Sequence, residues 1–166
     1  MKNQFQKNTI EKYADLVRDS IRKQLKEKKL YATGNLYRSI SNHLFEDNTT
    51  LGFEIRADKY FTQANKGRAR GRYVSHSKIK EWLLAKNITS EFYPDQSIDE
   101  FAAIISNTIK EKGTIKRFGY QGADIIENIM NEFSTDFFDE IIESFADDKD
   151  LTVKELLENV KITTVI

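Results

Sequence analysis

The chain has 166 residues, of which 39% are hydrophobic and 31% are charged. This length fits one domain that buries a core without disulfides or metals, so we expect a single domain over residues 1–166. The absence of cysteine excludes a disulfide framework, a thiolate zinc site and a cysteine nucleophile. No apolar run approaches the roughly 18 residues of a membrane span. Residues 1–7 lack the apolar core of a signal peptide, so we expect a cytoplasmic chain with no membrane partner.

The formal charges cancel over the whole chain but not within its halves. Residues 1–90 hold 19 Lys/Arg and 9 Asp/Glu, a net charge of +10, whereas residues 91–166 hold 7 and 17, a net charge of −10. Such a split is typical of a charged tail or a nucleic-acid partner. It also fits copies that meet basic surface to acidic surface, or two solvated faces of opposite sign.

The N-terminal half predicts one long helix and a hairpin. Residues 8–29 repeat apolar side chains with helical spacing, which predicts an amphipathic helix. The segment 33–35 breaks this pattern, and residues 36–40 begin either a second helical turn or a strand. Residues 39–57 alternate apolar and polar side chains around the polar turn 47–50, which predicts a β-hairpin.

The middle of the chain predicts a long loop followed by two helices. Residues 58–73 show no regular pattern and contain two glycines, so we expect a long loop, and such loops in compact domains are usually functional or disordered. A helix is predicted over 77–86. Ser97 and Glu100 have the spacing of a capping box, and they open a helix that Gly113 ends.

The C-terminal part predicts a long acidic helix and a strand. Residues 122–146 carry an apolar stripe at helical spacing, and no Lys or Arg lies between residues 124 and 148. Residues 151–159 predict a short helix and 160–166 a strand. We therefore expect the α+β class, with a long N-terminal helix and further helices packed on a small antiparallel sheet.

The sequence offers little for catalysis or metal binding. The only histidines, His43 and His76, lie far apart and lack metal-ligand spacing. Ser75 precedes His76, but neighbours at a helix start point in different directions, so they predict no nucleophile–base pair. The segment 67–71 lacks the GK[ST] end of a phosphate-binding loop. We expect no enzyme activity, no metal and no cofactor. A hydrolase with a carboxylate-built metal site is the third and weakest hypothesis.

A basic segment is the main candidate for a binding site. Four cations alternate with glycine and alanine: Lys66, Arg68, Arg70 and Arg72. In an extended chain they would form a row on one side, which suits phosphates or a row of carboxylates. A protein partner, a nucleic acid and plain solvation all remain open for this loop.

Several local patterns, read in order, resemble one protein family. They are TGNLYRSI at 33–40, Tyr60 before the glycine- and arginine-bearing loop, IKEWLLAKNI at 79–88, an amphipathic helix over 98–109, and Lys112-Gly113-Thr114 followed by Phe118. The chain is in this respect similar to the neck proteins of tailed bacteriophages, which join head to tail or complete the tail. The resemblance covers about residues 8–135.

The resemblance implies a non-enzymatic virion structural protein. Members of that family pack helices on a small antiparallel sheet and form rings between the portal or its adaptor and the tail. It implies a homo-oligomeric ring at the head–tail junction, assembled in the cytoplasm of a host bacterium, with portal, adaptor and tail proteins as partners. Genome DNA in the lumen is a further implied contact.

The predicted contact residues combine both charged segments. They are Lys66, Arg68, Arg70, Arg72, Asp136, Asp139, Glu140 and Glu143. Residues 147–166 lie outside the family pattern and form either an extension or a strand exchanged between copies. The alternative function is a nucleic-acid-binding accessory protein that uses the loop 66–72.

Overall fold

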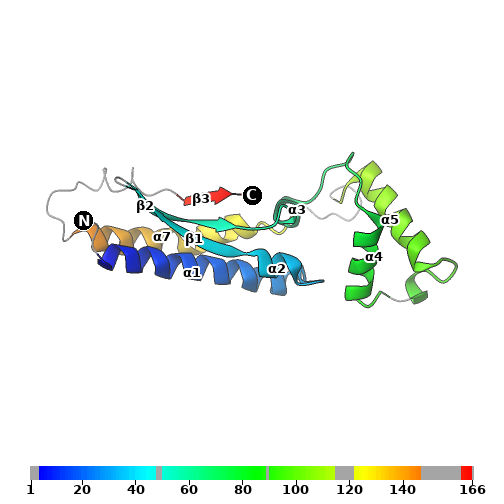
Figure 1. Cartoon of the computed structure of the whole chain (residues 1–166), viewed down its shortest axis with the longest axis horizontal. Coiled ribbons are helices and arrows are strands. Elements are labelled where there is room, and N and C mark those ends of the chain that lie inside the picture. Colours follow the sequence, from blue (N-terminus) through cyan, green and yellow to red (C-terminus); the bar gives the residue numbers. More distant parts are fainter. Residues whose placement is uncertain (1–3, 48–49, 89, 115–121, 147–161, 166) are drawn as a thin grey trace.

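Two long helices and a small sheet form the body of the protein, and a pair of shorter helices extends from one end of it (Figure 1). The computed structural model describes residues 4–47, 50–88, 90–114, 122–146 and 162–165. In chain order the elements are α1 (Gln4–Glu27), α2 (Asn35–Ser39), β1 (Ser41–Glu46), β2 (Leu51–Arg56), α3 (Tyr60–Lys66), α4 (His76–Ala85), the short 3-10 turn η1 (Ser90–Phe92), α5 (Ile98–Lys112), α7 (Ile125–Ala146) and β3 (Ile162–Val165).

The helices α1 and α7 lie antiparallel beside each other under the sheet (Figure 1). Their apolar sides form the main core with the inner face of β2. Polar side chains join the two helices along their length, and each successive contact moves forward on α1 and backward on α7. The pairs are Lys12 with Glu140, Ser20 with Glu132, and Gln24 with Asn128.

The sheet has three strands in the order β1-β2-β3. The strands β1 and β2 pair antiparallel, with Leu44 opposite Phe53, as the hairpin prediction requires. The strand β3 pairs parallel with β2, with Ile162 opposite Phe53. The α+β class, the long N-terminal helix and the antiparallel hairpin are thus confirmed, and a parallel strand extends the sheet at the β2 edge.

The helices α4 and α5 form a hairpin with a small core of its own. Ile79 and Leu83 of α4 pack on Ala102 of α5, and partly buried apolar side chains surround them. The amine of Lys86 donates to the carbonyl of Lys29 at 2.6 Å, which fastens the end of α4 to the end of α1. The α4–α5 hairpin therefore extends the molecule beyond the C-terminal end of α1 (Figure 1).

The prediction of an irregular loop over 58–73 is wrong for its first half, where α3 forms. The backbone N–H of Tyr60 donates to the side chain of Asp58, and the N–H of Phe61 donates to the Asp58 carbonyl, so Asp58 starts the helix. Phe61 and Ala64 are both buried at a helical spacing of three residues. One apolar pair is too short a pattern to distinguish a helix from a loop in sequence.

The other element predictions agree within a few residues at each end. The helices predicted at 8–29, 77–86 and 122–146 are observed as α1, α4 and α7, and the second turn after residue 35 is the helix α2. The strand predicted at 160–166 is β3. The short helix predicted at 151–159 lies outside the described residues, as does Phe118.

Candidate interaction surfaces

The basic segment crosses from the body to the α4–α5 hairpin and is bonded to the end of α5. The N–H of Arg68 donates to the hydroxyl of Thr114, and the N–H of Thr114 donates to the Arg68 carbonyl, both at 2.9 Å. Three residues further, the N–H of Gly71 donates to the carbonyl of Lys110 at 2.7 Å. Residues 68–71, which lead from the body to the α4–α5 hairpin, therefore lie beside the C-terminal end of α5, which leads back to the body.

Gly113 permits this close approach. It ends α5 with a φ of +68°, in the region that favours glycine, and its N–H donates to the Ile109 carbonyl. A Cβ at this position would overlap the backbone oxygen of Arg68. The sequence prediction that Gly113 ends the helix is confirmed. The structure adds that the absence of a side chain at Gly113 lets the backbone of the basic segment pack against the end of α5.

The predicted row of four parallel cations is not formed. Lys66 belongs to the last turn of α3, so it does not continue an extended segment. The guanidinium of Arg68 folds back toward the carbonyls of Arg72 and Tyr73, at 3.4 and 3.5 Å, and is partly buried. Arg70 and Arg72 are exposed. The loop bends because Gly71 adopts a φ of +110°, which an alternating extended strand does not.

Six exposed cations nevertheless gather around this segment and the end of α5, and we call them the basic surface. None of them forms an ion pair with any carboxylate among the described residues. They are Lys66, Arg70, Arg72, Lys78, Lys110 and Lys112. Residues 66–80 contain six Lys/Arg and no Asp or Glu, and at the end of α5 the exposed Glu111 lies between Lys110 and Lys112, so the surface has a net positive charge.

The acidic stripe of α7 divides into a bonded and an unbonded part. Glu140 accepts from the amine of Lys12 at 2.7 Å and from the hydroxyl of Tyr13 at 2.8 Å. These hydrogen bonds, from Lys12 first and then Tyr13, hold the pKa of Glu140 below its usual value. Burial, the hydrogen bond to Glu140 and the nearby negative charges raise the pKa of Tyr13 to about 12.

Asp136, Asp139 and Glu143 are exposed and have no cation partner among the residues that the structure describes. We call these three carboxylates the acidic surface. Of the eight predicted contact residues, Arg68 and Glu140 already have partners inside the chain. The other six remain available to another molecule, and their role stays a prediction.

Asn65 is a buried residue that the sequence did not single out. Its side-chain oxygen accepts from the N–H of Ile125 at 2.6 Å and of Ile126 at 3.2 Å, at the start of α7. Its amide donates to Glu127 at 3.3 Å, and its own carbonyl accepts from Ala123 at 2.8 Å. Asn65 is 1% exposed, and it caps α7 from a different helix. Its partners lie 60 residues away, so local sequence gives no signal for it.

The two histidines sit in different parts of the fold. His76 contacts the hydroxyl of Tyr73 at the start of α4, and His43 lies on β1 with its side chain exposed. Within the described ranges, no three His, Asp or Glu side chains come together as a metal site would require. No described helix has the length and apolar character needed to cross a membrane.

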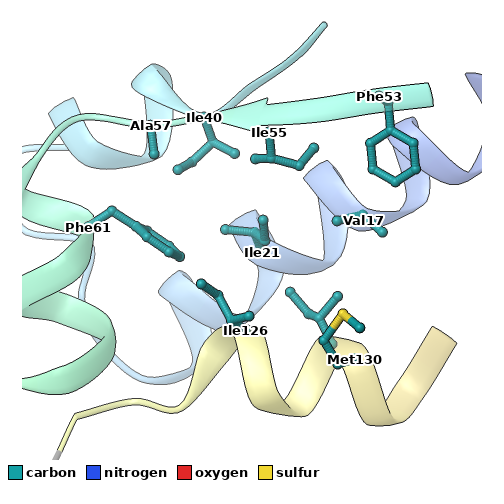
Figure 2. Close-up of a pocket in the computed structure, with 10 residues that line it drawn as sticks. Val17, Ile21, Ile40, Phe53, Ile55, Ala57, Phe61, Ile126 and Met130 are labelled. Atoms are coloured by element: carbon teal, nitrogen blue, oxygen red, sulfur yellow. The ribbon is translucent and has the colours of Figure 1, made fainter. Parts of the chain in front are cut away.

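A small apolar cavity lies inside the main core, between β2, α1, α3 and α7 (Figure 2). Its volume is about 40 Å³, far below the roughly 300 Å³ at which ligand pockets begin. Aliphatic and aromatic side chains line it, among them Ile21, Phe53, Phe61 and Ile129, so it offers water no polar partner. We therefore assign this cavity to imperfect core packing.

Comparison with known proteins leaves the interaction surfaces as the main guide to function. No protein-family model, no curated protein and no solved structure matches this chain.

Proposed function

We propose that this chain is a non-enzymatic structural protein of a tailed-bacteriophage virion, which forms a ring in the head–tail connector. The ring would lie at the head–tail junction, after assembly in the host cytoplasm, and join the portal or its adaptor to the tail. The proposal starts from the ordered sequence patterns at 33–40, 60–72, 79–88 and 112–114.

One structural observation carries the proposal furthest. The arginine-bearing loop and the glycine–threonine step are separate parts of the sequence pattern, more than 40 residues apart. In the fold they meet, because Arg68 and Thr114 exchange two hydrogen bonds and Gly113 seats the loop. This contact gives the spacing of the two patterns a structural reason, which supports reading them as one unit.

The charge distribution also supports a role in assembly. The basic and acidic surfaces are both exposed, and they occupy different places on one elongated molecule (Figure 1). Contacts between two different surfaces of identical copies are heterologous, and they close into rings when the rotation permits. A structural subunit of a connector requires contacts of this kind.

Mass measurement of the purified protein, by light scattering behind a sizing column, tests the proposal. We expect a discrete multimer of six or more copies, or a monomer that forms one when portal or adaptor protein is added. In purified virions of the source phage, the protein should be found in a fixed ratio to the portal. Absence from purified virions would overturn the proposal.

A nucleic-acid-binding accessory protein is the second candidate. The observation that favours it is the set of six exposed cations on the basic surface that form no ion pair within the part of the chain that the structure describes, since phosphate backbones bind such surfaces through Lys and Arg. This candidate predicts binding to duplex DNA that weakens steeply with salt. The acidic surface of α7 counts against it, unless that surface faces away from the nucleic acid.

A further inference from the structure

The basic and acidic surfaces are well separated within one copy. The acidic surface lies within one turn of Glu140, which contacts Lys12 in the N-terminal half of α1. The basic surface lies past the other end, where Lys86 bonds to Lys29 and Asn65 caps α7. An α-helix rises about 1.5 Å per residue, so the stretch from Lys12 to Glu27 alone separates them by roughly 20 Å.

This distance prevents the two surfaces from neutralising each other. At physiological ionic strength, exposed charges are screened beyond about 8 Å. The cations of the basic surface also lack carboxylate partners nearby in the described fold, and the acidic surface lacks cation partners. Each copy therefore presents an exposed basic surface of six cations and an exposed acidic surface of three carboxylates.

We propose that the basic surface of one copy docks on the acidic surface of α7 of the next copy. The central contacts pair Arg70, Arg72 and Lys66 with Asp136, Asp139 and Glu143. Arginine suits this role because its planar guanidinium binds a carboxylate through two parallel hydrogen bonds. This inference rests on the proposed function, and it specifies which surfaces join neighbouring subunits.

Two exposed aromatic side chains favour a protein partner at the basic surface. Tyr60 begins α3 and is 52% exposed, and Tyr73 ends the basic segment and is 46% exposed. Tyrosine and arginine are enriched among the residues that contribute most to protein interfaces. The charges would orient the copies and speed their encounter, while the aromatic rings would add buried apolar area.

Charge reversal on each surface tests this contact directly. The first variant is Arg70→Glu with Arg72→Glu, and the second is Asp139→Lys with Glu143→Lys. Because a head-to-tail contact uses both surfaces of every copy, neither variant should associate with itself. We expect the self-association constant of each variant to fall at least tenfold relative to the unchanged protein.

An equimolar mixture of the two variants should restore association. The reversed basic surface of one variant then meets the reversed acidic surface of the other, and the remaining contact pairs the two unchanged surfaces. The four substitutions combined in one chain should also restore it. Lys23→Glu with Lys28→Glu, and Glu91→Lys with Asp95→Lys, apply the same charge changes to exposed sites elsewhere. These controls should associate like the unchanged protein.

Each outcome decides the inference. Unchanged association of both reversed variants overturns it, as does an unchanged protein that stays monomeric even with portal or adaptor protein added. A mixture of the variants that stays monomeric where the unchanged protein associates also overturns it. If the first variant still assembles but loses binding to a DNA duplex, the basic surface is a nucleic-acid site instead. Circular dichroism confirms that each variant is folded. Detection in virions, which tests the proposed function, does not depend on these results.

Discussion

The side-chain oxygen of Asn65 lies 2.6 Å from the backbone nitrogen of Ile125. A residue at the end of one helix thus caps the start of another that begins 60 residues later. Because Asn65 also bonds to Glu127 and Ala123, it fixes the position of α7 against the body.

Replacement of Asn65 should destabilise the whole body. We expect Asn65→Ala to lower the free energy of unfolding by about 2–3 kcal/mol, since it removes a helix cap and leaves buried N–H groups unpaired. Asn128→Ala is the matched control, because Asn128 is an exposed amide on α7 with one bond to Gln24. Urea unfolding would measure both. Equal effects of the two substitutions would contradict the capping role.

Gly113 should be more sensitive to a side chain than Gly71. Both have positive φ angles, so alanine costs about 1–3 kcal/mol of backbone strain at either position. Only at Gly113 would the Cβ also overlap the Arg68 carbonyl, whereas the space around Gly71 is open. We expect Gly113→Ala to release the basic segment and to speed tryptic cleavage after Arg68 and Arg70. Cleavage at the same rate in Gly71→Ala would disprove the seating role.

The raised pKa of Tyr13 predicts a loss of stability in alkali. The folded protein holds the phenol proton up to a pKa of about 12, whereas an unfolded tyrosine releases it near 10.0. The contribution of the protonated Tyr13 phenol to the free energy of unfolding is therefore fully present below pH 10 and is lost as the pH rises through 12. The free energy of unfolding should fall less steeply over this range in Tyr13→Phe. The same slope in Tyr13→Phe and in the unchanged protein would contradict this account.

The capping box of α5 predicts a local effect in the α4–α5 hairpin. Ser97 accepts from the N–H of Glu100, and the Glu100 carboxylate accepts from the N–H of Ser97. We expect Ser97→Ala to cost about 1 kcal/mol, and Ser97→Thr to cost less because it keeps the hydroxyl. Hydrogen exchange should quicken in α5 while α1 stays protected. Equal loss of protection in α1 would show that the two parts unfold together.

Local sequence patterns predicted the elements whose signals are themselves local. Three of these patterns involve only residues close in sequence. They are the capping box at Ser97 and Glu100, the apolar stripes of α1 and α7, and the alternation around residues 47–50. These patterns predict structure correctly because the hydrogen bonds and apolar faces that they specify form between residues close in sequence. The missed helix α3 has only a single apolar pair, and it forms because the main core buries that pair.

The candidate site was harder to predict, because distant residues shape it. The sequence identified the cations at 66–72 but not the hydrogen bonds between Arg68 and Thr114, which hold the segment against the end of α5. It identified the acidic stripe but not the bond from Tyr13 to Glu140, which uses one carboxylate internally. Both outcomes depend on contacts between residues more than 40 positions apart, and no window of a single sequence records them.

The two chain segments that connect the body to the α4–α5 hairpin lie side by side, so the hairpin is arranged like a domain inserted into a loop. Asn65 and Arg68 lie where the chain runs from the body to the hairpin, and Thr114 and Ala123 lie where it runs back. Backbone hydrogen bonds join Arg68 to Thr114 and Asn65 to Ala123. A short glycine linker in place of residues 68–114 would leave the Asn65 cap and the main core in place. We therefore expect the hairpin to be separable: its removal should leave a smaller α+β protein, and grafted onto another closed loop, it would carry Arg68, Arg70 and Arg72 with it.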